Sequence, residues 1–431
     1  MSISILYDLS RLMTRVLNAT PNGIDRIDHL LAGHFLNHRD FETFALGLGF
    51  NGPRVLHEKT TLGAAGRVAA AWQESASEAS QPSQTYETIV ARLCAPLPPS
   101  GAPRRLVQPR PKRVFHVTKA LLRYGPARGS APRAAVPRDS IYINAAHFPL
   151  EWKRHVAWLD DRPDVRPVFW IHDLLPIERP DLFWRHEPAR HAQRLDLLAR
   201  RGAAAAVASA CVEDSLRRHL DRAGRRNLPV FRSAPPAAAI FAERGKRDDR
   251  LTQIPFFLAC GTIEPRKNHL TLLRVWRDLV KKHGPDAPKL VVVGKRGWNS
   301  ADIVSALEDE SLRGHVIEAA GLPTPDYKRL LDHCRALLAP SLAEGFGLPM
   351  AEALLAGTPV IASDIPPFRE QRGPNVVYLD PLSDAEWNRA ILGLAGPRVP
   401  TQAAGGALAR GDVSRHQSAY LDAFDGFLRN L

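Results

Sequence analysis

The chain has 431 residues, a formal net charge of +13, and hydrophobic and charged fractions of 45% and 24%. These fractions are those of a folded globular protein and exclude a disordered one, and the length exceeds what one hydrophobic core usually supports, so we expect two domains. The sequence shows no apolar run of roughly 18 residues, which a membrane-spanning helix needs, and no secretory signal at its start, so we expect a cytoplasmic protein.

The cysteines and the net charge further limit the structural class of the protein and the kind of partner it binds. No two cysteines form a C-x-x-C pair, which argues against a zinc knuckle or a disulfide framework and predicts reduced thiols. The four are Cys94, Cys211, Cys260 and Cys334. The positive charge indicates an anionic partner, which is a nucleic acid, a membrane surface or a phosphorylated small molecule.

The first half of the chain alternates short apolar runs with segments of helical period. The expected strands are residues 2–10, 41–48, 140–146, 165–173 and 204–210. The expected helices are residues 23–36, 150–161, 189–202 and 211–224. This alternation predicts a parallel, doubly wound sheet, and we assign residues 1–235 to this N-terminal domain.

A basic, proline-rich insertion at about 97–139 interrupts this domain. Residues 98–139 hold ten Arg or Lys and a single acid, Asp139. Three interpretations stay open: a solvated insertion, a surface that meets anionic lipid or a lipid-diphosphate acceptor, and a nucleic-acid contact. The last is the weakest because Phe115 and Tyr124 are too few aromatics for a stacking platform.

The second half repeats the alternation more regularly. Residues 236–252 lack a clean period and form the predicted linker, and residues 253–412 form the second domain, with a doubly wound parallel sheet. The expected strands are 256–261, 289–294, 315–321, 334–340 and 358–364, and the expected helices are 268–284, 299–314, 324–334 and 349–357. Residues 413–431 are amphipathic, and we expect them to pack back on the N-terminal domain as a closing helix.

Residues 339–364, APSLAEGFGLPMAEALLAGTPVIASD, carry two carboxylates around a glycine-containing turn. Pro349 fits the first turn of a short helix, so unpaired N–H groups of that helix start point into the turn and favour an anion there. Glu344 precedes the turn, and Glu352 lies one helical turn beyond it. A separation of roughly 10 Å is at or beyond the limit for a hydrolase pair. We therefore interpret the two acids as hydrogen-bond acceptors that hold the two ends of a nucleotide sugar.

The segment EGFGLPMAE (344–352) resembles the E-x7-E signature of retaining GT-B glycosyltransferases. Together with GTIEPRKN (261–268) it is similar to the GT4 family, and WIHDLLPIERPDLF (170–183) and YDLSRL…TPNGIDRI resemble GT4 enzymes of bacterial surface-polysaccharide assembly. The resemblance covers most of 255–365 and is poor over 40–140. It implies a GT-B fold, in which two Rossmann-like, doubly wound parallel-sheet domains face each other across a cleft.

The resemblance also implies an activity. We expect a retaining enzyme that moves a hexose, with mannose, glucose and rhamnose as candidates, from a nucleotide-sugar donor to a glycan or lipid-linked glycan acceptor in polysaccharide or lipopolysaccharide biosynthesis. The leaving diphosphate would deprotonate the acceptor hydroxyl on the same face of the sugar. The chain has no Asp-x-Asp, so we expect no metal and no cofactor. We expect peripheral contact with anionic membrane at its cytoplasmic face and no nucleic-acid partner.

Roles for single residues follow from the same resemblance. Arg266 and Lys267 would neutralise the donor diphosphate, whose charge grows as it leaves. Glu352 would hold the ribose, and Glu344 the transferred sugar. The amides of the turn would lie near the sugar or the phosphates; its residues are Gly345, Phe346, Gly347 and Leu348. Many GT4 members carry an Arg where this chain has Thr262, which we still place in the donor site.

The first domain contributes further candidates. Gly23 would let the backbone approach the diphosphate, although an ordinary turn glycine fits the sequence as well. His172 would bond a hydroxyl of the reacting sugar, with a satisfied buried histidine as the alternative. His147 and Asp173 would line the acceptor side or serve the structure.

Two other classes of function remain open at this point. A nucleotide-sugar epimerase or a phosphorylase could share the same cleft, but the first needs no acceptor and the second needs inorganic phosphate. A non-catalytic protein that binds anions or a membrane is the alternative outside enzymes.

Overall fold

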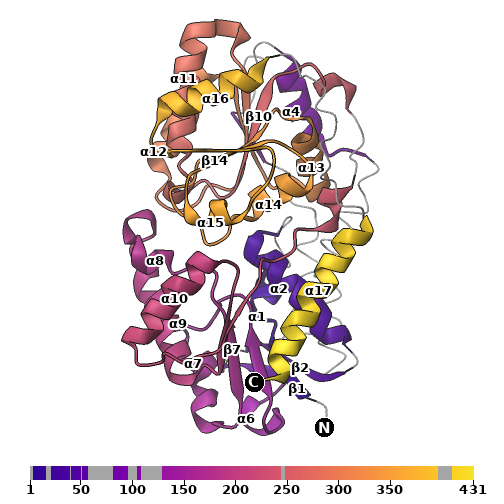
Figure 1. Cartoon of the computed structure of the whole chain (residues 1–431), viewed down its shortest axis with the longest axis vertical. Helices are drawn as coiled ribbons and strands as arrows, with labels where there is room; N and C mark the ends of the chain where they lie inside the picture. Colours follow the sequence, from indigo (N-terminus) through magenta and orange to yellow (C-terminus); the bar gives the residue numbers. More distant parts are fainter. Residues whose placement is uncertain are drawn as a thin grey trace.

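The computed structural model describes residues 3–15, 21–38, 40–49, 51–56, 81–95, 104–107, 129–243, 248–396 and 410–431. Two sheets of α/β type lie one above the other, each with its own helices (Figure 1). The parallel α/β sheets predicted from the alternating pattern are confirmed. Most of the basic insertion, including Phe115 and Tyr124, lies outside the described residues.

The N-terminal sheet has the strand order β5-β3-β2-β1-β6-β7-β8-β9. Its strands are β1 Ile3–Asp8, β2 Phe41–Gly47, β3 Arg54–Leu56, β5 Gly129–Ser130, β6 Ile141–Asn144, β7 Arg166–Trp170, β8 Ala204–Val207 and β9 Val230–Arg232. In the part of the sheet with the order β2-β1-β6-β7-β8-β9, every pair of neighbouring strands is parallel. At the other edge, β3 pairs antiparallel with both β2 and β5, a feature that the sequence pattern did not predict.

The helices of this domain flank the parallel strands. They are α1 Ser10–Arg15, α2 Gly23–Asn37, α6 Pro132–Ala135, α7 Lys153–Val156, α8 Leu175–Glu178, α9 Glu187–Arg201 and α10 Ala210–Arg222. Helix α2 begins with a complete capping box, in which Asn22 accepts from the Asp25 N–H and Asp25 accepts from the Asn22 N–H. The cap fixes the start of α2, at Gly23, where the two domains meet.

The C-terminal sheet has the strand order β15-β14-β13-β10-β11-β12-β4, with every pair parallel. Its strands are β4 Arg105–Val107, β10 Phe256–Cys260, β11 Lys289–Val293, β12 Val316–Ala320, β13 Leu337–Ala339, β14 Val360–Ser363 and β15 Val376–Leu379. Its helices are α4 Gln84–Cys94, α11 His269–His283, α12 Ala301–Leu307, α13 Thr324–His333, α14 Leu348–Leu355, α15 Pro366–Glu370 and α16 Asp384–Ala395.

The assignment of all residues 1–235 to one N-terminal domain differs from the structure at α4 and β4, which belong to the C-terminal sheet. Strand β4 extends the edge of β12, where Arg105 forms an ion pair with Glu318. Helix α4 buries Ile89 and its apolar neighbours in the C-terminal core. Strand β4 thereby pairs with the otherwise open edge of β12, and α4 covers the apolar core beside it. This is the physical reason why these two elements belong to the C-terminal domain.

Two predicted helices are also shorter than expected. Residues 150–161 form α7 followed by a 3-10 turn, η1 Ala157–Asp161. The segment 299–314 forms only α12, because the Asp309 side chain accepts from the Ser311 N–H and caps a separate 3-10 turn.

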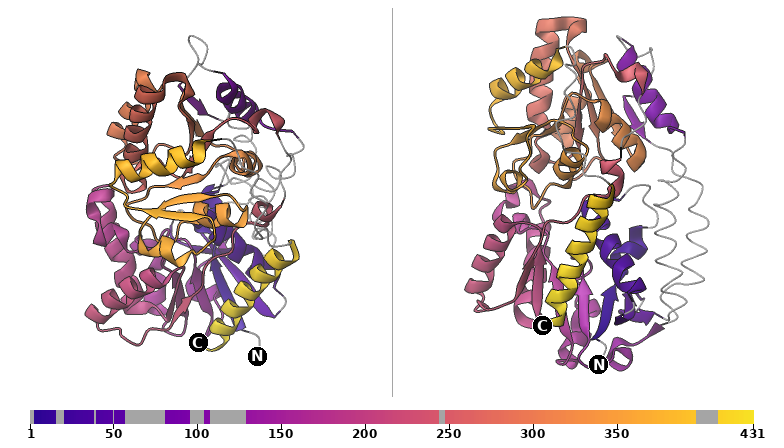
Figure 2. Two further views of the ribbon diagram at one scale, coloured as in Figure 1. Left: turned by 45° about the horizontal axis from the view of Figure 1, so that its top comes forward. Right: turned by 45° about the vertical axis from the view of Figure 1, so that its right-hand side comes forward.

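The chain ends in helix α17 Arg410–Arg429, drawn in yellow, which lies along the N-terminal domain beside α2 (Figures 1 and 2). Its apolar face buries Tyr420, Phe424 and Leu428 in the N-terminal core. Asp425 on the same helix pairs with His34 and His38 of α2 at 2.8 and 3.1 Å. The chain therefore returns to its first domain after completing its second.

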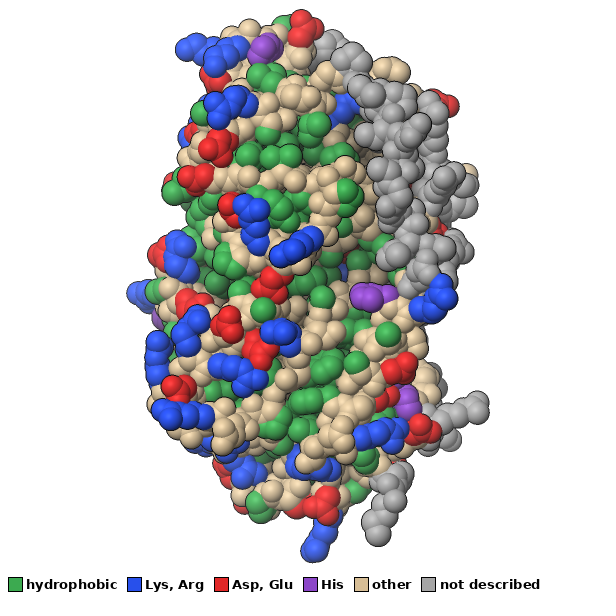
Figure 3. Space-filling view, viewed as in Figure 1, with side chains coloured by type: hydrophobic (Ala, Val, Ile, Leu, Met, Phe, Trp, Pro, Cys, Tyr) green, Lys and Arg blue, Asp and Glu red, His purple; other side chains and the backbone are tan. Residues whose placement is uncertain are grey.

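The surface carries both signs of charge. Lys and Arg alternate with Asp and Glu over both domains on the face drawn in Figure 3, so the excess of positive charge forms no single patch there. Among the described residues, no helix combines the length and the apolar character needed to cross a bilayer.

Candidate active site at the domain boundary

The turn at 345–348 touches the N-terminal domain. The Ser209 hydroxyl, at the end of β8, donates to the Gly345 carbonyl at 2.7 Å. A Cβ added at Gly345 would lie 2.1 Å from the His172 carbonyl oxygen, so a side chain cannot fit there without moving the backbone. The carboxyl end of the N-terminal sheet and the start of α14 therefore meet at this glycine.

Gly347 forms the turn itself. It has φ of 94°, in the left-handed region, and a Cβ there would lie 2.4 Å from the Phe368 ring. Helix α14 starts at the next residue with Pro349 in its first turn, and no side chain caps it. The predicted turn and helix start are thus present. The Met350 and Ala351 N–H groups donate to the Gly347 carbonyl and Pro349 has no N–H, so the Leu348 N–H and the helix dipole are what this helix start offers to an anion.

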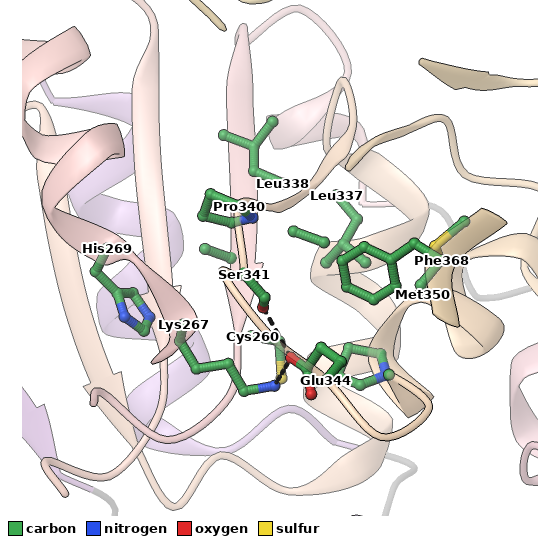
Figure 4. Close-up of a pocket in the computed structure, with 14 residues that line it drawn as sticks. Cys260, Lys267, His269, Leu337, Leu338, Pro340, Ser341, Glu344, Met350 and Phe368 are labelled. Carbon is green, nitrogen blue, oxygen red and sulfur yellow. Dashed lines mark hydrogen bonds and ion pairs between the residues drawn. The ribbon is translucent and has the colours of Figure 1, made fainter. Parts of the chain in front are cut away.

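Glu344 binds both cations of the EPRKN segment. Its carboxylate accepts from Arg266 at 2.7 Å and from the Ser341 hydroxyl at 2.7 Å, and it forms a close ion pair with Lys267. Figure 4 shows Lys267 and Ser341 directed toward Glu344 in a pocket that Cys260 and Met350 also line. Burial alone would raise the pKa of Glu344, but Lys267 and Arg266 outweigh it and lower the pKa to about 2.

Hydrogen bonds between two loops that are far apart in the sequence hold these cations beside Glu344. A 3-10 turn, η5 Pro265–Lys267, ends at Asn268, whose side-chain amide donates to the Pro340 carbonyl at 3.1 Å. The Leu342 N–H donates to the Arg266 carbonyl at 2.8 Å. Arg266 also pairs with Glu264, whose pKa burial raises. The loop after β10 and the loop after β13 therefore form one charged unit.

Two residues predicted for the donor site, Gly23 and Thr262, lie around this unit, and so does Gly261, which was not predicted. A Cβ at Gly23 would lie 3.0 Å from Leu348 Cδ1, so the start of α2 faces the start of α14. Gly261 has φ of 144°, and the Lys267 side chain passes 3.2 Å from the place of its absent Cβ. The Thr262 methyl lies against Gly297, on the side of the loop that follows β11.

Glu352 lies at the other end of the segment and is 3% exposed. Its partner is Arg26 of α2, whose Nε is 3.4 Å from Glu352 Oε1. Burial raises the pKa of Glu352, and Arg26 acts against that rise. Sequence reasoning missed Arg26, although the GIDRI segment places it three residues after Gly23 and so close to the same helix start.

His172 is a neutral residue of this boundary. Its Nε2 lies 2.8 Å from the Ala145 carbonyl, so Nε2 carries the proton and Nδ1 can only accept a hydrogen bond. Burial lowers the pKa of His172 to about 3, which keeps the ring uncharged at neutral pH. The ring is therefore set up to accept a bond from a hydroxyl.

His147 and Asp173 have different surroundings at this boundary. His147 is buried and accepts the His172 N–H at 3.2 Å, so it orders the end of β7. Asp173 accepts the Leu175 N–H at 3.1 Å. Burial raises the pKa of Asp173 and Arg266 opposes that rise, which places this carboxyl within the field of the charged unit.

Residues 243–394 match the model of the family described as Glycosyl transferases group 1. The chain is 29% identical over 241 residues to the serotype-specific mannosyltransferase WbdA of Escherichia coli, a match that covers 52% of this chain and 29% of WbdA. It is 26% identical over 221 residues to the O-antigen chain mannosyltransferase RfbU of Salmonella typhimurium, with 51% and 58% covered. The chain thus spans less than two thirds of the length of either relative.

A solved structure extends the likeness to the whole fold. The sucrose-phosphate synthase of Thermosynechococcus elongatus superimposes with a TM-score of 0.61 at 14% identity, and the match covers 99% of this chain and 98% of that one. Residues 243–394 therefore match the group 1 glycosyltransferase family model, and the chain as a whole has the GT-B fold that its sequence predicts.

Proposed function

We propose that the chain is a retaining, metal-independent glycosyltransferase that moves a hexose from a nucleotide sugar to a glycan or lipid-linked glycan acceptor in polysaccharide or lipopolysaccharide biosynthesis. The observation that carries the proposal is the unit of Glu344, Arg266 and Lys267 beside the uncapped start of α14. Cations beside the N-terminal end of a helix form a site for a group that becomes more anionic as it leaves.

Mannose comes first among the candidate sugars, because the curated relatives WbdA and RfbU are both described as mannosyltransferases. These descriptions also favour a transferase over an epimerase, a phosphorylase or a non-catalytic anion-binding protein. Work on a lipid-linked acceptor would place the enzyme at the cytoplasmic face of a membrane, with peripheral contact to anionic lipid.

In the proposed reaction, the bond between the anomeric carbon and the diphosphate oxygen breaks while the acceptor oxygen approaches on the same face. The acceptor proton passes to the departing diphosphate oxygen, so the configuration at the anomeric carbon is retained. Arg266 and Lys267 would turn from Glu344 toward the diphosphate, and Glu344 would then accept hydrogen bonds from the sugar hydroxyls. His172 Nδ1 would accept a further hydroxyl, and Glu352 the ribose pair.

A thermal-shift panel with UDP, GDP, dTDP and CDP in the presence of EDTA tests the donor site. One nucleotide at about 100 times its Kd should add about 2.7 kcal/mol to the stability of the wild-type chain and much less to that of Glu352→Ala. The matching nucleotide sugar is then incubated with a lipid-linked acceptor, and the anomeric configuration of the product is read by NMR.

The outcomes separate the candidate functions. Transfer in EDTA with retained configuration supports the proposal. An epimer formed without acceptor, a requirement for inorganic phosphate, or loss of transfer in EDTA that a divalent metal restores would each overturn the part of the proposal that it contradicts.

A further inference from the structure

Arg26 and Glu352 form an ion pair between the two domains. Arg26 lies in the first turns of α2, beside the N-terminal sheet, and Glu352 lies in α14, beside the C-terminal sheet. Their side chains are 22% and 5% exposed, and 3.4 Å separates Nε from Oε1. A pair between different domains exists only while the two starts of α2 and α14 face each other.

The guanidinium of Arg26 is held from further sides. It lies over the ring of Phe241 at 5.6 Å from the ring centre, and its Nη2 lies 3.4 Å from the hydroxyl of Thr324. Phe241, in the 3-10 turn η3 Ala239–Ala242, is buried in the C-terminal core. An arginine on the surface usually loses side-chain entropy when it forms an ion pair. The Arg26 side chain loses less, because its packing against Phe241 already fixes its conformation.

Glu352 has few other partners. Within the described ranges, Arg26 is its single ion-pair partner, and no hydrogen bond from another side chain reaches its carboxylate. The other titratable groups that face it are the Cys260 thiol, at the end of β10, and the Tyr327 hydroxyl of α13. Neither is a cation, so Arg26 alone opposes the effect of burial, which raises the pKa of Glu352.

A carboxylate must be ionised to accept two hydrogen bonds at full strength, because bonds to a charged acceptor are roughly twice as strong as neutral ones. The proposed function assigns such a pair of bonds to Glu352, from the vicinal hydroxyls of the donor ribose. The carboxylate must also keep its free lone pairs directed at the ligand. A cation held from the opposite domain meets both needs and leaves the ligand side open.

We infer that Arg26 is a positioning residue of the donor site, which reaches from the N-terminal domain to keep Glu352 ionised and aimed at the ribose hydroxyls. The inference rests on the proposed function. It adds that nucleoside recognition by the C-terminal domain depends on a residue of the other domain. It also assigns Arg26 to the ribose end of the donor, whereas Arg266 and Lys267 serve the diphosphate end.

The test uses the full chain and two ligands: the nucleoside diphosphate of the panel that binds best, and its nucleoside without phosphates. Binding is titrated calorimetrically from pH 6 to pH 8.5 for wild type, Arg26→Gln, Arg26→Lys and Glu352→Gln. Arg277→Gln is the matched control, because Arg277 pairs with Asp309 at 2.7 Å on the surface, away from Glu352. Arg26→Met, which keeps an unbranched stem against Phe241, is the second variant if Arg26→Gln does not fold.

Without Arg26, burial acts unopposed on Glu352, so its carboxyl protonates at a higher pH. Arg26→Gln should therefore weaken both ligands about tenfold at pH 6 and regain most of the affinity at pH 8.5. Arg26→Lys should stay close to wild type. In Glu352→Gln, which has no carboxyl to titrate, the dependence on pH should vanish, and Arg277→Gln should change nothing.

Three results would overturn this inference and leave the proposed function intact. A loss confined to the diphosphate ligand and equal at every pH would mean that Arg26 contacts the phosphates. Tighter nucleoside binding would mean that Arg26 competes with the ribose. Binding by Arg26→Gln equal to that of wild type would mean that Glu352 needs no partner. A wild-type chain that binds none of the nucleotides would instead overturn the proposed function, and this inference with it.

Discussion

Glu344 and Glu352 are eight residues apart in the chain, yet their surroundings shift the pKa of their carboxyl groups in opposite directions. Glu344 accepts from two cations of its own domain, which lower its pKa to about 2, whereas Glu352 has one cation from the other domain and a raised pKa. The difference shows that one short motif contains two electrostatic sites, one closed within the C-terminal domain and one that depends on the contact between domains.

The largest effect should come from the Glu344 end. Glu344→Ala or Lys267→Ala should lower turnover by about 100- to 1000-fold, the usual cost of removing a group that stabilises developing charge. Sugar transfer under saturating donor measures it. Arg274→Gln, which disrupts an exposed pair with Asp384, is the control and should keep full turnover. Unchanged rates in folded variants at position 344 or 267 would refute the assignment.

The contact between the domains offers a steric comparison of two glycines. Gly345→Ala places a methyl group 2.1 Å from a backbone oxygen of the other domain, while Gly23→Ala meets only the end of the Leu348 side chain at 3.0 Å. A backbone carbonyl cannot move aside as easily as the end of a leucine side chain. Gly345→Ala should therefore lower kcat/KM at least about tenfold, or by more than about 1.4 kcal/mol, and Gly23→Ala should lower it by less than about threefold. Equal effects would contradict the geometry.

The smallest and sharpest difference concerns the stability of the ligand-free chain. Glu344→Gln leaves two half-buried cations, Arg266 and Lys267, short of a partner and should lower the free energy of unfolding at pH 7 by about 1–3 kcal/mol. Glu352→Gln removes a buried charge that has a single partner, and should leave stability unchanged or raise it by up to about 1 kcal/mol. Urea unfolding measures both variants against wild type.

The dependence on pH should also differ in sign. The folded pKa of Glu344 is lowered, so its contribution is complete above the unfolded value and is lost as the pH falls toward 2. The folded pKa of Glu352 is raised, so its ionisation costs stability that returns as the pH falls through that raised value. A deficit of Glu344→Gln that does not shrink in acid, or the same sign for both variants, would contradict the comparison.

Much of the fold was predictable because the signals are local. The strands at 256–261 and 289–294 correspond to β10 and β11, since branched apolar runs closed by turn residues suit only buried strands of a parallel sheet. The turn before α14 was predictable for the same reason, because Gly347 tolerates the left-handed backbone of a turn and Pro349 fixes its own φ at a helix start. The antiparallel edge at β3 gave no such signal, since three residues are too few to show a period.

The sequence by itself determined two parallel α/β units, the turn and helix start at 345–349, and the presence of Glu344, Glu352, Arg266 and Lys267, because propensity and spacing act over a few residues. Only the tertiary structure decided that α4 and β4 complete the second sheet, that α17 returns to the first, and that Arg26 meets Glu352. These are contacts between residues up to hundreds of positions apart, and they form because an open sheet edge, an apolar helix face and a buried carboxylate each need a partner, wherever in the chain it lies.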